Sequence, residues 1–126
     1  MPLVHIDLQK GKTSAFRQTV SDIVYQAIIE TVNVPANDRF QVITEHEKED
    51  LIYDPTYLGI QRTDEILFIQ ITLNAGRTVD LKRALYQTIA NRLHEQLGVR
   101  KEDVFISLVE VTKENWSYGN GIAQYA

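Results

Sequence analysis

Pro2, the residue directly after the initiator methionine, has the most distinctive chemical potential in this sequence. Removal of Met1 would turn its ring nitrogen from an amide into a secondary amine. An ordinary α-amino group titrates at about 7.7–8.0, so a shift of about one unit decides its protonation state at neutral pH. Burial beside apolar groups and cations favours a neutral general base, whereas a nearby carboxylate favours a cationic general acid. Pro2 is therefore a candidate for proton-transfer chemistry in either direction.

The overall composition excludes several classes of protein. A chain of 126 residues is long enough for one domain, expected to span 1–126, with a core that needs no metal or disulfide. The net charge of −4 argues against a nucleic-acid partner. The absence of cysteine excludes a disulfide framework and thiolate catalysis, and the three histidines lack the spacing of metal ligands. No apolar stretch approaches the roughly 20 residues of a membrane span, so we expect a cytoplasmic protein with no membrane partner.

The chain aligns with itself at a shift of 65 positions, which places Leu3–Glu45 on Phe68–Glu110 without a gap. Identical residues fall where secondary structure begins or ends, which is typical of a duplicated unit. The matching pairs include Gly11 with Gly76, Thr13 with Thr78, Asp38 with Asp103, and Glu45 with Glu110. Features shared by both copies are expected to belong to the fold, and features of one copy are better candidates for function.

Each copy is predicted to form a strand, a helix and a second strand. The predicted strands are Leu3–Leu8, Phe40–Thr44, Ile66–Leu73 and Val104–Val111. Apolar residues recur at helical spacing after Thr13 and Thr78, which occupy N-cap positions, and Gly98 is a C-terminal stop. Connections of this length favour parallel pairing within each copy. We therefore expect an α+β fold, in which a duplicated β-α-β unit forms a four-stranded sheet with two helices on one face.

Two segments lie outside the repeat. The acidic stretch Glu45–Glu65 contains the turn signal Asp54-Pro55 and is expected to be a surface connection with one short extended piece. In the tail 112–126, the Asn-Gly dipeptide within Gly119-Asn120-Gly121 predicts a hairpin. The sheet face opposite the helices would expose branched apolar residues to water, so oligomerisation is expected.

Four stretches, in order along the chain, resemble the tautomerase superfamily, and in particular its malonate semialdehyde decarboxylase-like branch. These stretches are PLVHIDL, VPANDRFQVITEH, AGRT and NWSYGNG. The likeness runs from Pro2 to Tyr125 and includes the duplicated β-α-β unit. It implies a homotrimer with three active sites, and neither a metal nor an organic cofactor.

The resemblance also implies roles for particular residues. The family's N-terminal proline, active-site aspartate and second carboxylate-binding arginine correspond to Pro2, Asp38 and Arg77, and its aromatic residues correspond to Trp116, Tyr118 and Tyr125. Arg77 would hold a substrate carboxylate through bidentate hydrogen bonds, and Asp38 would align a water, a proton or the proline nitrogen. The decarboxylase pattern reads Arg-Pro-Arg where this chain reads Ala75-Gly76-Arg77, so the first arginine is missing.

Keto–enol tautomerisation of a small oxo-carboxylate is the function that these features favour, because it requires only Pro2 and a carboxylate-binding group. Malonate semialdehyde decarboxylase or hydratase activity is an alternative, made less favourable by the missing arginine. A non-catalytic trimeric ligand-binding protein of the same fold is a third hypothesis.

Three of the candidate residues also have simpler structural explanations. Asp38 could serve a turn, as its counterpart Asp103 would. Arg77 could be a solvated charge like its counterpart Lys12, and Trp116 could pack between subunits.

Overall fold

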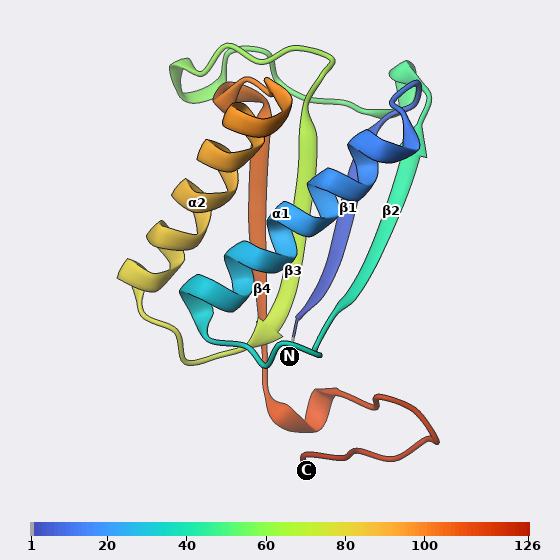
Figure 1. Ribbon diagram of the computed structural model, residues 1–126, viewed down its shortest axis with the longest axis vertical. Helices are drawn as coiled ribbons and strands as arrows, with labels where there is room; N and C mark the ends of the chain where they lie inside the picture. Colours follow the sequence, from blue (N-terminus) through green and yellow to red (C-terminus); the bar gives the residue numbers. More distant parts are fainter. Residues whose placement is uncertain (1) are drawn as a thin grey trace.

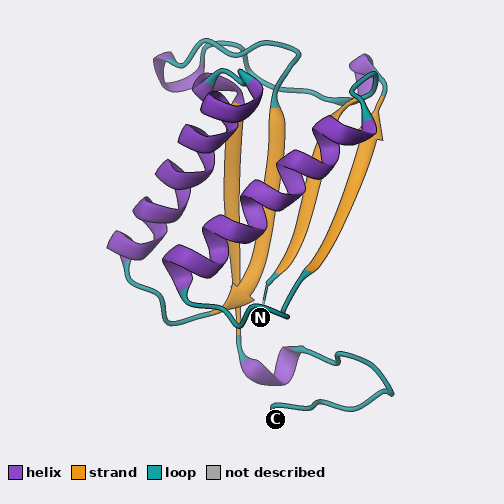
Figure 2. Cartoon of the chain, viewed as in Figure 1, coloured by secondary structure: helices purple, strands orange, loops and turns teal. Residues whose placement is uncertain are grey.

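The computed structural model describes residues 2–126 and consists of a four-stranded sheet with two long helices on one of its faces (Figure 1). The strands are β1 (Leu3–Gln9), β2 (Phe40–His46), β3 (Leu67–Asn74) and β4 (Val104–Val111), and the helices are α1 (Ser14–Val32) and α2 (Val79–Leu97). These elements follow one another twice as β-α-β (Figure 2). The predicted α+β class is confirmed, and the strand ends differ from the prediction by two residues at most, with β4 matching at both ends.

The strand order in the sheet is β2-β1-β3-β4. Strand β1 pairs with β2 in parallel, and β3 pairs with β4 in parallel, as the repeat predicts. The two halves meet through the antiparallel pair of β1 and β3. This pairing places the beginnings of β1 and β2 at the same end of the sheet as the ends of β3 and β4.

Both helices begin as the sequence predicts, and α2 also ends as predicted. The hydroxyl of Thr13 accepts a hydrogen bond from the Phe16 N–H at 3.0 Å, and that of Thr78 accepts one from the Leu81 N–H at 3.2 Å. A threonine at this position satisfies a backbone donor that the first helical turn leaves unpaired. Helix α2 ends at Gly98, whose φ of 67° is accessible to glycine at little steric cost.

The core lies between the helices and the sheet. Its fully buried members from the helices are Val20, Val24, Ala27, Leu85, Ile89 and Leu93, which pack on Val4, Ile6, Ile69 and Ile71 of the central strands. This set confirms the predicted helical stripes, except that Leu81, in the first turn of α2, is exposed. Within residues 2–126, neither helix combines the length and apolar character that a membrane span requires.

The opposite face of the sheet is open. Phe40 and Val42 of β2 and Phe105 and Val109 of β4 are exposed there, because no described segment covers the centre of this face. The alternation of buried and accessible residues along β1 and β3 shows that the helices cover one side of the sheet only. An exposed apolar surface of this kind is typical of a protein–protein interface.

The connection between the two halves contains two short 3₁₀ turns, Lys48–Asp50 and Tyr57–Gly59. The one short extended piece expected within Glu45–Glu65 is limited to the last two residues of β2. The connection lies at the end of the sheet opposite to the C-terminal tail (Figure 1).

The predicted C-terminal hairpin is wrong. A 3₁₀ turn (Lys113–Asn115) leads into a loop, and no strand pairing occurs within residues 112–126. The chain does reverse at Gly119–Gly121, where all three residues have positive φ. The side chain of Gln124 closes this reversal, because its oxygen accepts from the Tyr118 N–H at 2.9 Å and its nitrogen donates to the Gly119 carbonyl at 3.0 Å. A two-residue hairpin turn joins two paired strands, whereas the residues on both sides of this reversal are in loop conformation.

Candidate active site

The sheet topology brings the predicted site residues to one end of the molecule. Pro2 directly precedes β1 and Asp38 comes just before β2, while Arg77 follows β3 and the aromatic tail follows β4. Because β3 and β4 run towards the end from which β1 and β2 start, these four segments converge. Figure 1 shows the amino terminus and the tail at this same end.

Pro2 is buried. The next residue, Leu3, pairs with Phe40 on one side and Thr72 on the other, which fixes the position of Pro2 between β2 and β3. Pro2 is not among the described residues that line the cavities at this end. The predicted removal of Met1 concerns a residue outside the described range.

Asp38 is buried, and it lines a cavity of about 370 Å³. The cavity is lined by Pro35, Asn37, Asp38, Phe40, Tyr118, Gln124 and Tyr125. Burial raises the pKa of the Asp38 carboxyl above its ordinary value, and the positive charge of the chain's amino terminus opposes this shift. A carboxyl group with a raised pKa in a mainly apolar cavity is suited to proton transfer.

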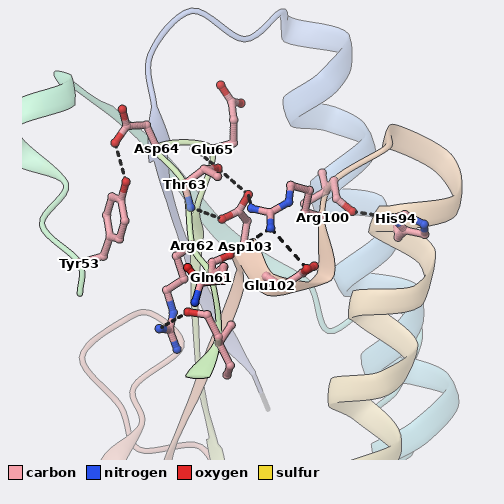
Figure 3. Close-up of polar contacts among 12 residues, drawn as sticks. Tyr53, Gln61, Arg62, Thr63, Asp64, Glu65, His94, Arg100, Glu102 and Asp103 are labelled. Carbon is pink, nitrogen blue, oxygen red and sulfur yellow. Dashed lines mark hydrogen bonds and ion pairs between the residues drawn. The ribbon is translucent and has the colours of Figure 1, made fainter. Parts of the chain in front are cut away.

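The equivalent residue in the second half, Asp103, has a structural role. Its carboxylate accepts hydrogen bonds from the backbone N–H and the hydroxyl of Thr63, both at 2.7 Å, and it contacts Arg100 at 3.5 Å (Figure 3). Thr63 belongs to the segment that leads into β3, so the chain itself fills the space beside Asp103. At the other end of the sheet, the corresponding space beside Asp38 is the cavity that contains Tyr118.

Arg77 is oriented by backbone carbonyl groups. Its guanidinium donates to the carbonyl of Asn74 at 2.9 Å and to that of Val32, the last residue of α1, at 3.4 Å. The partial negative charge at a helix C-terminus favours this placement of a cation. Arg77 also lines a second cavity, of about 250 Å³, together with Lys113 and Tyr125. Since Pro35 and Tyr125 line both cavities, the two adjoin.

The three predicted aromatic residues lie together. The rings of Trp116 and Tyr118 are stacked, with centroids 5.6 Å apart and an interplanar angle of 12°. Tyr125 meets Tyr118 edge-on at 5.8 Å. The indole N–H of Trp116 donates to the side-chain oxygen of Asn74 at 2.8 Å, which ties the aromatic tail to the end of β3. Such a cluster can exclude water from the neighbouring cavities and strengthen electrostatic interactions inside them.

Sequence reasoning missed four residues that build this end of the molecule. Lys113 supplies a second cation beside Arg77, Asn74 anchors Trp116, Gln124 closes the tail, and Phe40 contacts Tyr118 with ring centroids 6.3 Å apart. Lys113 and Gln124 lie outside the repeat, so the comparison of the two halves gives no signal for them. Asn74 could have been found from its position, because it is a polar residue between the apolar part of a strand and Ala75-Gly76.

His46 and His94 lie away from this site. His46, at the end of β2, contacts the Asp7 carboxylate at 2.6 Å in a separate cavity of about 440 Å³ on the open sheet face. His94 contacts the backbone carbonyl of Val99 at 3.0 Å. Among residues 2–126, no group of three or more His, Asp or Glu side chains is placed to hold a metal ion.

Comparison with known proteins identifies the family to which this fold belongs. Two family models, both described as tautomerase enzyme, match residues 38–119 and 2–61. The probable tautomerase YusQ of Bacillus subtilis (strain 168) is 50% identical over 124 residues, which cover 98% of both chains. The chain belongs to the tautomerase superfamily.

Two solved structures are similar to this chain over almost its whole length. The FG41 malonate semialdehyde decarboxylase, inhibited by 3-bromopropiolate, matches with a TM-score of 0.91 and 36% identity, over 98% of this chain and 93% of that one. This likeness supports the malonate semialdehyde decarboxylase-like branch. The symmetric trimer of wild-type fused 4-OT matches with a TM-score of 0.80 at 22% identity, over 98% of this chain and 97% of that one, and shares the fold.

Proposed function

We propose that this chain is a cofactor-independent tautomerase, in which the amine of Pro2 moves a proton on a small oxo-carboxylate. The observation that carries the proposal is the convergence of Pro2, Asp38, Arg77 and the aromatic tail at one end of the sheet. Within the superfamily, a relative of 50% identity is named a probable tautomerase. This reaction needs a base or acid, a carboxylate-binding group and a dry cavity, and each has a candidate here.

Arg77 and Lys113 are the candidates for binding the substrate carboxylate. Backbone carbonyls hold the Arg77 guanidinium in one orientation before any ligand arrives, which lowers the entropy lost on binding. A substrate whose carboxylate binds at Arg77 extends into the cavity of Asp38, since the two cavities adjoin. Trp116, Tyr118 and Tyr125 then shield the reacting carbons from water.

Pro2 is the candidate base. Its nitrogen, once Met1 is removed, takes a proton from the carbon next to the oxo group, and the electrons of that C–H bond form the C=C bond of the enolate. The amine then delivers a proton, either this one or one gained by exchange with solvent, to the enolate oxygen or to carbon, so the reaction is balanced without a co-reactant. Asp38 and Pro2 lie at the same end of the sheet, which makes Asp38 the candidate for aligning the proton that this amine transfers.

Two measurements test this proposal together. A 2-oxo acid with exchangeable protons at C3, such as 2-oxobutanoate, is incubated with the protein in D₂O, and loss of the C3 proton signal is followed by NMR. The Pro2 nitrogen is titrated in parallel by ¹⁵N NMR. We expect catalysed exchange and a midpoint below the reference amine value of about 7.7–8.0. The proposal is wrong if exchange is not catalysed or if no titrating amine is present, and the second result would favour a non-catalytic ligand-binding protein.

Malonate semialdehyde decarboxylase or hydratase activity is the second candidate. The structural likeness to a malonate semialdehyde decarboxylase favours it, and Lys113 adds a positive charge near the position where the first arginine of the family pattern is missing. A Pro2 midpoint clearly above the reference amine value would indicate a cationic acid. Release of carbon dioxide from malonate semialdehyde would then establish the activity.

Neutralising Lys113 tests the carboxylate-binding site. We expect Lys113→Gln to raise KM for a 2-oxo acid roughly 2- to 5-fold with little change in kcat, because an exposed ion pair contributes up to about 1 kcal/mol. The effect should shrink with added salt. Lys101→Gln, an exposed lysine at the opposite end of the sheet, is the matched control. An unchanged KM in the Lys113 variant would show that Lys113 does not contribute to carboxylate binding.

We also propose that the chain assembles as a homotrimer through the open face of the sheet. Phe105 is 45% exposed on that face, and Val79 is 60% exposed at the start of α2, in the helical layer. We expect Phe105→Lys to weaken assembly by more than roughly 10-fold, because a buried unpaired charge is costly, while Val79→Lys leaves it intact. Sedimentation velocity at several concentrations measures both. Equal assembly of the two variants would exclude the open face as the interface.

A further inference from the structure

Tyr118 carries a buried hydroxyl group at the cavity of Asp38. Its oxygen is inaccessible to solvent and has no hydrogen-bond partner among residues 2–126. Buried polar groups in folded proteins nearly always have a partner, so a hydroxyl that has none among the described residues and lines a cavity is placed to bind an atom of a ligand. Two neighbouring polar side chains of the tail do have partners: the Trp116 indole donates to Asn74, and the Gln124 amide bonds the backbone through both its oxygen and its nitrogen.

The Tyr118 ring is held in place from several sides. Trp116 stacks on one of its faces, Tyr125 meets it edge-on, and Phe40 of β2 contacts it at 6.3 Å between centroids. Its backbone N–H is bound by the side chain of Gln124. A side chain fixed in this way presents its hydroxyl at one position, and a donor that need not reorganise is the kind that stabilises a developing charge most effectively.

The surroundings keep this hydroxyl protonated. Burial, the nearby Asp38 carboxylate and Tyr125 raise the pKa of Tyr118 to about 12. Tyr118 therefore remains a neutral hydrogen-bond donor over the whole working range of pH. A ligand oxygen atom between the Tyr118 hydroxyl and the Asp38 carboxyl would accept a hydrogen bond from Tyr118.

Resting on the proposed function, we infer that the Tyr118 hydroxyl donates a hydrogen bond to the oxo oxygen of the substrate and to the enolate oxygen that forms from it. The carboxylate of the substrate then lies at Arg77, and its oxo group lies in the cavity of Asp38 and Tyr118. When Pro2 removes the proton from carbon, the π electrons of the C=O bond move to this oxygen. Tyr118 stabilises the resulting charge without transferring its own proton, and the proton held by Pro2 completes the reaction.

This assignment predicts selectivity for substrates that carry an oxygen acceptor at that position. A site built to donate to a substrate oxygen discriminates against the analogue that lacks it, since the buried donor is then left unpaired. The chain should therefore bind 2-oxobutanoate more tightly than butanoate, which has the same carboxylate and no oxo group.

The test compares Tyr118→Phe with Tyr86→Phe, a matched removal of one hydroxyl from α2. Binding of 2-oxobutanoate and of butanoate is measured by calorimetry, which requires no turnover, and C3 exchange is measured by NMR. We expect Tyr118→Phe to lower the ratio of the two affinities roughly 10-fold and kcat for exchange by roughly 10- to 100-fold, with butanoate binding unchanged. Tyr86→Phe should match the unmodified protein.

The two readouts separate the possible failures. If Tyr118→Phe keeps the preference for 2-oxobutanoate, the assignment of Tyr118 is overturned whatever the state of the proposed reaction. If affinity for both acids falls equally, Tyr118 only shapes the cavity, and the inference is again wrong. If the preference depends on Tyr118 but no variant catalyses exchange, the binding role stands and the tautomerase proposal fails.

Discussion

In a Pro2→Ala variant, C3 exchange of a 2-oxo acid is expected to fall roughly 10²- to 10⁴-fold, the contribution usual for a positioned general acid or base. Alanine still presents a primary amine after Met1 is removed, so residual exchange is expected. The nitrogen of Pro2, by contrast, is part of a rigid ring, and Pro2 is buried directly before a central strand, so the position of this nitrogen is fixed. A flexible primary amine in this place loses that orientation.

The control for this prediction is Pro55→Ala, which removes a proline from the connection at the opposite end of the sheet. Both variants should keep the circular dichroism spectrum and the oligomeric state of the unmodified protein, because neither proline lies within a helix or a strand. Mass spectrometry of the purified proteins reports whether Met1 is absent. Full exchange activity in Pro2→Ala, with Met1 removed, would rule out the proposed mechanism.

The two equivalent aspartates should respond in opposite ways to the same substitution. Asp38→Asn is expected to lower kcat/KM roughly 10²-fold or more, because the cavity of the proposed site loses its carboxyl group. Its stability at pH 7 should be equal or higher. Asp103→Asn is expected to lower the free energy of unfolding by about 1–3 kcal/mol, since the hydrogen bonds from Thr63 depend on a carboxylate. Its activity per folded molecule should be unchanged.

The pH dependence of stability gives Asp38 a signature of its own. Its pKa is raised in the folded protein, so folding is favoured while the carboxyl is protonated, below its unfolded value of about 3.9. This contribution is lost as the pH rises through the raised, folded-state pKa. The stability gain of Asp38→Asn over the unmodified protein should therefore be present at pH 7 and vanish near pH 3.5.

Thermal unfolding and exchange assays on both variants, at pH 7 and near pH 3.5, measure these effects. If Asp103→Asn lost activity and kept stability, the comparison of the two halves would be wrong. If Asp38→Asn kept full activity, Asp38 would be a turn residue like its counterpart.

The fold was predictable because the repeat carries its own signals. Thr13 and Thr78 are N-caps, Gly98 is in the left-handed conformation, and the apolar stripes of both helices are buried, all of which follow from local chemistry and periodicity. Strand pairing within each half follows from the length of the connections. The antiparallel pairing of β1 with β3 was not predicted, and it is this pairing that gathers the site at one end.

The site was predictable only in part. The sequence named the residues that converge there, but the arrangement of the tail depends on contacts between distant side chains, such as Trp116 with Asn74 and Gln124 with Gly119. Such contacts leave no periodic pattern in a sequence. The different roles of Asp38 and Asp103 could not be predicted from the sequence either. These roles depend on the surroundings of each carboxylate, which are Thr63 for Asp103 and a cavity for Asp38.

The contacts of Thr63 with Asp103 bear on the number of ligands that each chain can hold. A duplicated unit has two equivalent ends, and each end has its aspartate. Linking the two units into one chain places the segment around Thr63 inside one of these ends, where it occupies the position of a ligand. We therefore expect one ligand-binding site of this kind per chain, because the connection between the halves fills the equivalent space at the other end of the sheet.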